Sequence, residues 1–136
     1  MLNFFTKNKD NLHIKTAALL IHAAKIDENY SDIEKKIIKE ALINLNNINS
    51  DQAEELMKFA EKKEEGSNQM IEFTREIKKH PMEFRLKIIE IIWKIVYSDD
   101  VSDNYESNLI RRICGLLYIS DKDNGIIRTK VKNSQK

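Results

Sequence analysis

The sequence has few residues that interrupt or cross-link a chain: three glycines, one proline and one cysteine in 136 residues. So few breakers, together with 33% charged residues, favour an all-α soluble protein. The lone Cys114 cannot form an internal disulfide, so no disulfide partner is expected. It lies in an apolar run, which predicts a buried thiol in a reducing compartment, the cytoplasm. No apolar stretch approaches about 18 residues, so no membrane-spanning helix is expected.

Other absences argue against particular classes of function. The formal net charge of +1 provides no long-range attraction to nucleic acid. The three histidines form no i, i+4 pair, so a zinc site is not indicated, and we expect His22 to be a partly buried helix residue. The chain has no glycine-rich phosphate loop and no nucleophile elbow, so neither an organic cofactor nor a catalytic residue is indicated.

The length indicates one domain, which can bury about 65–70% of its unfolded surface without a disulfide or a metal. We divide the chain into an N-terminal extension (1–10), a helical domain (11–123) and a basic tail (124–136) that can belong to a last helix. The apolar start lacks a basic leader, so it is not expected to be a secretory signal. The basic end is either a solvated face or a contact for an acidic partner or a lipid headgroup.

Apolar residues at helical spacing predict seven helices. We expect them at about 11–25, from 31 to about 47, from 50 or 51 to a break at 64–67, at about 70–77, 82–97 and 103–118, and after Ser120. The fifth carries apolar residues on most of its faces, which is typical of a central buried helix, and Trp93 is expected in its core.

The chain repeats a pattern at an offset of 72 residues. Residues 27–34 and 99–106 each contain four acids, and each segment lies between two apolar helical runs. We call these segments the first and the second elbow. In the helix after each elbow, Ile37 pairs with Leu109 and Ala41 with Ile113 at this offset. A unit of helix, acidic elbow and helix is therefore repeated.

Part of each elbow has an architectural interpretation. Ser31-x-x-Glu34 and Asp103-x-x-Glu106 have the pattern of a capping box, in which the cap oxygen and the glutamate each satisfy a free backbone amide. Acids in a first turn also suit the helix dipole. On this interpretation these four residues serve the fold alone.

Asp27 and Asp99 do not fit that interpretation. Each follows the end of a helix, where unpaired carbonyl groups already carry partial negative charge. A carboxylate is unfavourable there unless a positive group is near, either a lysine, for which Lys25 and Lys94 are candidates, or a metal ion. Carbonyl and carboxylate oxygens are hard ligands, suited to Mg²⁺ or Ca²⁺ and not to zinc.

These residues carry a resemblance to the TerB family, the tellurite-resistance-protein-B-like proteins of bacteria. It covers about Leu12 to Asp123 and includes "AALLIHAAKID", "RLKIIEIIWKIVYSDD" and "YESNLIRRICGLLYIS". The resemblance implies an all-helical fold with an internal repeat of helix pairs. It also implies a divalent-cation site formed by Asp27, Glu34, Asp99 and Glu106. The family often has glycine directly after the elbow aspartate, where this chain has Glu28 and Asp100.

Family members are associated with resistance to tellurite and other stresses, and some work with membrane partners. The resemblance therefore implies a non-enzymatic, cation-responsive module that acts through protein contacts in a stress pathway. A metal-free scaffold whose acids are helix caps is the alternative. A metal-dependent hydrolase ranks last, because no general base or nucleophile stands out beside the acids.

Overall fold

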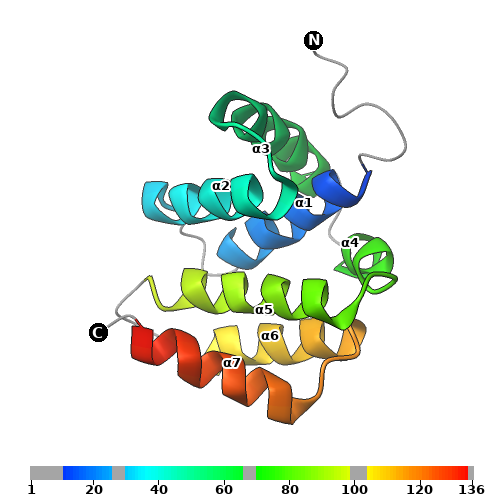
Figure 1. The fold of residues 1–136 in the computed structure, drawn as a ribbon, viewed down its shortest axis with the longest axis vertical. Coiled ribbons are helices and arrows are strands. Elements are labelled where there is room, and N and C mark those ends of the chain that lie inside the picture. Colours follow the sequence, from blue (N-terminus) through cyan, green and yellow to red (C-terminus); the bar gives the residue numbers. More distant parts are fainter. Residues whose placement is uncertain (1–10, 26–29, 66–69, 99–103, 135–136) are drawn as a thin grey trace.

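The computed structural model describes residues 11–25, 30–65, 70–98 and 104–134, with only the backbone described at 11 and 104–107. All regular structure in these ranges is helical, which confirms the predicted all-α class. The helices are α1 (Asn11–Lys25), α2 (Asp32–Asn46), α3 (Ser50–Glu65), α4 (Met70–Ile77), α5 (Met82–Val96), α6 (Asn104–Leu116) and α7 (Asp121–Ser134) (Figure 1). The last helix includes residues that the sequence analysis assigned to the basic tail.

Polar residues and the single proline set the helix boundaries. Ser31 is the N-cap of α2, and Pro81 lies at the N-cap of α5, where its missing N–H costs nothing. Asn47 is the C-cap of α2, and its φ of 53° is a left-handed conformation that asparagine tolerates. These local signals are readable in the sequence, and the observed boundaries agree with the predicted ones to within a residue or two.

The unit α5–α6–α7 repeats the unit α1–α2–α3. A left-handed residue follows each of α2 and α6: Asn47 (φ 53°) directly after α2, and Tyr118 (φ 58°) two residues after α6. The next helix is then capped by the side chain of the residue just before it, Asn49 before α3 and Ser120 before α7. The side-chain oxygen accepts a hydrogen bond from a backbone amide in the first turn of that helix. In each unit the first helix packs on the second and third, and the second packs on the third. The repeat of helix pairs thus extends to triplets, with α4 between them.

Helix α1 lies at the centre of the molecule. It packs against α2, α3, α4 and α5, and the side chains of Ala17–Ile21 are all 0% exposed. Five consecutive buried residues cover every side of a helix with 3.6 residues per turn. The small side chains of Ala17, Ala18, Ala23 and Ala24 let the neighbouring helices approach closely.

Helix α5 is the central helix of the second unit, as predicted from its apolar faces. Its buried residues are Ile88, Ile89, Ile91, Ile92, Trp93, Ile95 and Val96, which confirms that Trp93 belongs to the core. The helix contacts α1, α2, α6 and α7. The two central helices also pack against each other, so the two triplets share one core.

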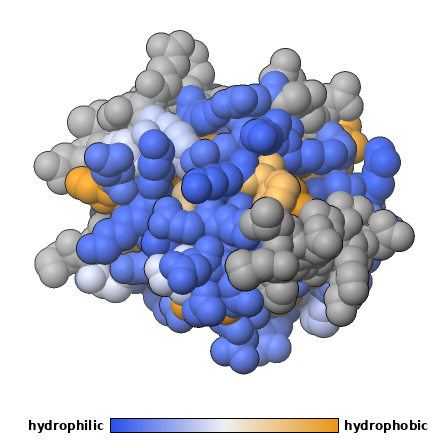
Figure 2. Space-filling view, turned by 90° about the horizontal axis from the view of Figure 1, so that it is seen from above, coloured by the Kyte–Doolittle hydropathy of each residue, from blue (hydrophilic) through white to orange (hydrophobic). Residues whose placement is uncertain are grey.

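The described surface shows few large apolar side chains. Seen from the side on which α3 lies, it is mostly hydrophilic, with apolar residues in small separate patches (Figure 2). The exposed large apolar residues are Ile33, Ile71, Met82 and Ile126, each from a different helix, and Tyr118 between α6 and α7. No helix in the described part of the chain is long and apolar enough to cross a membrane.

Helix α7 is attached to α5 through one aromatic cluster. The Trp93 indole N–H donates to Asn124 Oδ1 at 2.9 Å. The Trp93 ring stacks on Tyr97 with centroids 5.6 Å apart, and the Arg128 guanidinium lies 5.0 Å from the Trp93 ring. Because α7 buries only Ile127 and Val131 as apolar side chains, these contacts contribute a large share of its attachment.

We expect Asn124→Ala to lower the free energy of unfolding by about 1–2 kcal/mol, because the indole N–H of Trp93 would be buried without an acceptor. Urea denaturation at neutral pH measures this change. Asn133→Ala is the matched control, since Asn133 is exposed on the same helix. Equal stability of the two variants would show that the hydrogen bond does not hold α7 in place.

Candidate cation site and the charged network at the first elbow

Of the four residues expected to bind a cation, only Glu34 has a described side chain. Asp27 and Asp99 lie outside the described residues, as do Glu28 and Asp100. The backbone of Glu106 is part of α6, but its side chain is not described. The geometry of the expected site can therefore be built from Glu34 and from the helix ends that carry the two elbows.

Glu34 is a buried carboxylate, 3% exposed, in the first turn of α2. Its Oε1 accepts from the Ser31 backbone N–H at 2.9 Å, and its own N–H donates to Ser31 Oγ at 3.2 Å. This reciprocal pair is the capping box predicted from the sequence, and it fixes the orientation of the Glu34 side chain. The equivalent box at the second elbow lies outside the described residues.

The repeat brings the ends of the elbow helices to one end of the molecule. Helices α1 and α5 pack against each other and run in similar directions, so that their C-terminal ends lie toward the same end of the molecule in Figure 1. Helices α2 and α6 both begin at that end. The carbonyl termini of α1 and α5 and the acidic first turn of α2 therefore share one region.

A buried ion pair joins this region to α3. The Glu64 side chain, 9% exposed, lies 2.8 Å from Lys25 Nζ and 3.2 Å from His22 Nδ1. Burial alone would raise the pKa of Glu64, but hydrogen bonds and charge from Lys25 and His22 outweigh it, and the pKa lies below its ordinary value. His22 is thus a partly buried helix residue, as expected, and Lys25 has a carboxylate partner on α3.

Tyr30 lies among three carboxylates at the start of the same region. Its hydroxyl donates to Glu61 Oε2 at 2.9 Å. Burial, the hydrogen bond to Glu61 and the charges of Glu61, Glu64 and Glu34 together raise the pKa of Tyr30 well above its ordinary value. Lys35 Nζ lies 4.8 Å from the centre of the Tyr30 ring and brings positive charge to the cluster. The phenol therefore stays protonated and acts as a donor.

The contribution of α3 to this network is not among the sequence predictions. Glu64 was expected at the start of a break between helices, whereas it is a buried residue of α3, which ends at Glu65. A signal was present: the buried stripe Ala53, Leu56, Met57 and Ala60 continues four residues later at Glu64. A carboxylate on an apolar stripe indicates a buried partner of opposite charge.

Within the described residues, no three His, Cys, Asp or Glu side chains form a group that could hold a metal ion. The described part of the network is instead satisfied by Lys25, His22 and backbone amides. Its chemistry is that of a fixed electrostatic joint between α1, α2 and α3. A cation site at this end of the molecule requires carboxylates of the elbows beyond Glu34.

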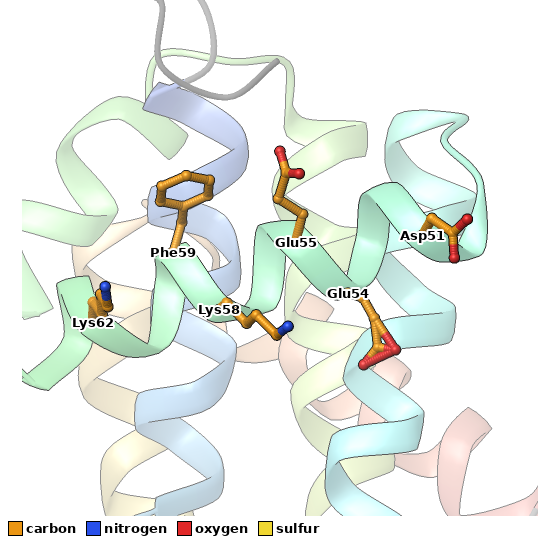
Figure 3. A pocket seen from close by; sticks show the side chains of 6 residues that line it. All are labelled: Asp51, Glu54, Glu55, Lys58, Phe59 and Lys62. Carbon is orange, nitrogen blue, oxygen red and sulfur yellow. The ribbon is translucent and has the colours of Figure 1, made fainter. Parts of the chain in front are cut away.

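Two further features offer no catalytic group. A hollow along α3 is lined, among the described residues, by Asp51, Glu54, Glu55, Lys58, Phe59 and Lys62. These side chains come from a single helix and spread away from one another, so they do not converge on a ligand (Figure 3).

Burial, with a smaller effect of Asp121, raises the pKa of the Cys114 thiol to about 12. The buried, unreactive cysteine agrees with the prediction.

Taken together, the fold is that of an all-α protein with two helix triplets, in which an acidic elbow joins the first two helices of each. A family model described as Tellurite resistance protein TerB matches residues 13–129, which is most of the chain, and the chain belongs to the TerB family. The resemblance drawn from the sequence is thereby confirmed. Neither curated proteins nor solved structures give a significant match.

The Glu64 network predicts how the stability of the protein depends on pH. Because the pKa of Glu64 is lower in the folded state than in the unfolded state, its stabilisation is present above the unfolded-state pKa and is lost as pH falls through the folded-state pKa. We expect Glu64→Gln to be less stable than the parent at neutral pH, and to lose less stability between about pH 7 and about pH 3.

Urea denaturation of both proteins across this pH range measures the effect. Glu65→Gln is the matched control, since Glu65 is the exposed neighbour of Glu64 on the same helix. The parent and the control should show the same pH dependence. A Glu64→Gln variant with the parent's pH dependence would mean that this carboxylate is not stabilised by Lys25 and His22.

Proposed function

We propose that this TerB-family protein is a non-enzymatic helical module that binds a divalent cation at its two acidic elbows. The ligands would be Asp27 and Glu34 from the first elbow, and Asp99 and Glu106 from the second. In this proposal the cation-bound module acts through a protein partner, which can be membrane-associated, in a pathway of resistance to tellurite or related stress.

One observation carries the proposal. The repeat directs α1 and α5 toward the same end of the molecule, and α2 and α6 begin at that end (Figure 1). The two elbows connect these helix ends in the sequence, and the proposal is that their carboxylates, 72 residues apart, meet there. A single ion between them would join the two triplets.

The electrostatics at this end favour a hard cation. The last carbonyl groups of α1 and α5 carry partial negative charge, and Glu34 adds a carboxylate held in place by Ser31. Oxygen ligands of this kind suit Mg²⁺ or Ca²⁺. Lys25 already compensates Glu64, so the helices can pack without an ion and the ion would act as a regulator of the module.

The capping box at Ser31 also supports the alternative, a metal-free scaffold in which Glu34 serves α2 alone. The two functions differ in a measurable way. A cation site depends on the charge of Glu34, whereas a cap depends on its ability to accept a hydrogen bond. Glutamine retains the second property and loses the first.

We expect calorimetric titration of the chelator-treated protein with Mg²⁺, Ca²⁺ or Mn²⁺ to show saturable binding, together with a rise in melting temperature. Glu34→Gln should weaken binding by about tenfold or more, because affinity in such sites follows the number of charged ligands. Its fold should remain intact, because glutamine also completes a capping box. Asp27→Asn and Asp99→Asn should weaken binding in the same way.

Glu83→Gln is the control, because Glu83 is an exposed acid in the first turn of α5, away from both elbows. It should bind like the parent. Absence of binding by the parent at millimolar ion would exclude the cation site and favour the metal-free scaffold. Equal binding by the parent and the elbow variants would place the ion elsewhere.

A further inference from the structure

A groove runs between α2 and α5, with its outer edge on α7. It has a volume of about 520 Å³. On α2 its floor is Ile37, Ala41 and Leu45, which follow one another at i, i+4 and i+8 along one helix face, and Ile91 of α5 completes it. The three α2 residues are half-buried although they pack against the main core. The floor is therefore an apolar strip about two helical turns long.

The equivalent strip in the second triplet is covered. At the offset of 72, Ile37, Ala41 and Leu45 correspond to Leu109, Ile113 and Leu117 of the second triplet, which are 6%, 0% and 0% exposed. Helix α4 packs on α6 in this triplet, and it packs on α1 as well. The equivalent residues are thus buried in the triplet on which an additional helix packs, and they line an open groove in the other.

The surface of α1 and α6 on which α4 packs is equivalent, in the repeat, to the groove between α5 and α2. Exchanging the triplets converts α1 into α5 and α6 into α2, so a helix that packs on α1 and α6 corresponds to one that would pack on α5 and α2. Those two helices form the walls of the groove. In Figure 1, α4 lies to the right of the two central helices, α1 and α5. Helix α2 lies away from α4, above α5, and packs against it. The repeat therefore defines the occupant as a helix.

The side chains of α4 indicate the pattern of that occupant. Helix α4 is eight residues long and buries Met70, Phe73, Thr74 and Ile77, at i, i+3, i+4 and i+7. A helix with this spacing presents one apolar stripe to its seat. An apolar strip of two turns on α2 matches such a stripe in length.

The charges around the groove indicate which charge a bound helix should carry along one edge. The wall formed by α5 and α7 carries Lys87, Lys94 and Lys130. Glu90 is the single carboxylate on that wall, 3.6 Å from Lys94 Nζ and 3.4 Å from Lys130 Nζ. Lys87 is exposed and pairs with no described residue, so the wall has excess positive charge. The α2 wall carries one charged residue, Glu40.

We propose that the groove between α2 and α5 binds an amphipathic helix of a protein partner, whose apolar stripe covers Ile37, Ala41 and Leu45 and whose acidic edge faces the lysines of α5 and α7. This inference rests on the partner-binding part of the proposed function and is independent of the cation site. The bound helix takes the place in the first triplet that α4 takes in the second. Burial of the strip provides affinity, and the lysine wall selects the orientation and the partner.

Two designed helical peptides test the proposal by fluorescence anisotropy. Both carry apolar residues at the spacing of α4, with glutamine on one edge; the other edge is glutamate in the first peptide and lysine in the second. The glutamate peptide should bind and the lysine peptide should not. Lys87→Glu should weaken the glutamate peptide by about tenfold and strengthen the lysine peptide, because it reverses one charge of the wall.

Ala41→Gln is a second variant, which fills the floor with a polar side chain and should weaken both peptides. Circular dichroism and melting temperature confirm that each variant is folded. Lys58→Glu, on the outer hollow of α3, is the matched control and should bind like the parent. Failure of the glutamate peptide to bind, or equal binding by the parent and Lys87→Glu, would overturn the proposal.

The titrations are run with chelator and again with Mg²⁺. Binding with chelator supports the groove whether or not the cation site exists, and calorimetry tests that site separately. Binding only in the presence of Mg²⁺ would contradict the stated independence of the groove from the ion. The two proposals can therefore fail one at a time.

Discussion

Helix α1 is surrounded by protein on every side, and the positions of α2, α3, α4 and α5 follow from this burial. The consecutive residues Ala17–Ile21 are all inaccessible, and alanines on either side of the leucines allow four neighbours to approach. A helix buried in this way can carry charge only at its ends. Its C-terminal turn carries His22 and Lys25, which suit the negative end of the helix dipole and meet the carboxylate of Glu64 on α3. The packing of the core thus determines where the charged network forms.

Because of this charged network, the fold does not depend on a cation at the elbows. Glu64 is buried, and removal of its partners would leave an unpaired charge in the protein interior, which is strongly destabilising. Lys25 and His22 fill this role from within the chain, so the joint between α1 and α3 is complete without an ion. Glu34 is likewise held by Ser31. A divalent ion at the elbows would therefore act on a fold that is already formed, which is the behaviour of a regulatory site and not of a structural metal site.

The helices themselves could be predicted because their signals are local. The capping box at Ser31, the proline at Pro81 and the apolar stripes each depend on a few adjacent residues. The Glu64 pairs could not be placed in the same way, because they join residues 39 and 42 positions apart and depend on the packing of α1 against α3. The third helix of the repeat was also missed. In α3 and α7 the equivalence lies in the caps at Asn49 and Ser120 and in the packing, whereas their apolar residues differ.

The two triplets are equivalent in their internal packing and different in what covers them. The chain between the triplets supplies one additional helix, α4, which packs on α1 and α6, and no equivalent helix of the described chain packs on α5 and α2. The uncovered strip on α2 is then left as the groove. Its walls are α2, which starts at the first elbow, and α5, which ends at the second. The groove residues lie along the length of these two helices and not at the ends that carry the elbows, so a partner helix could bind there with or without an ion.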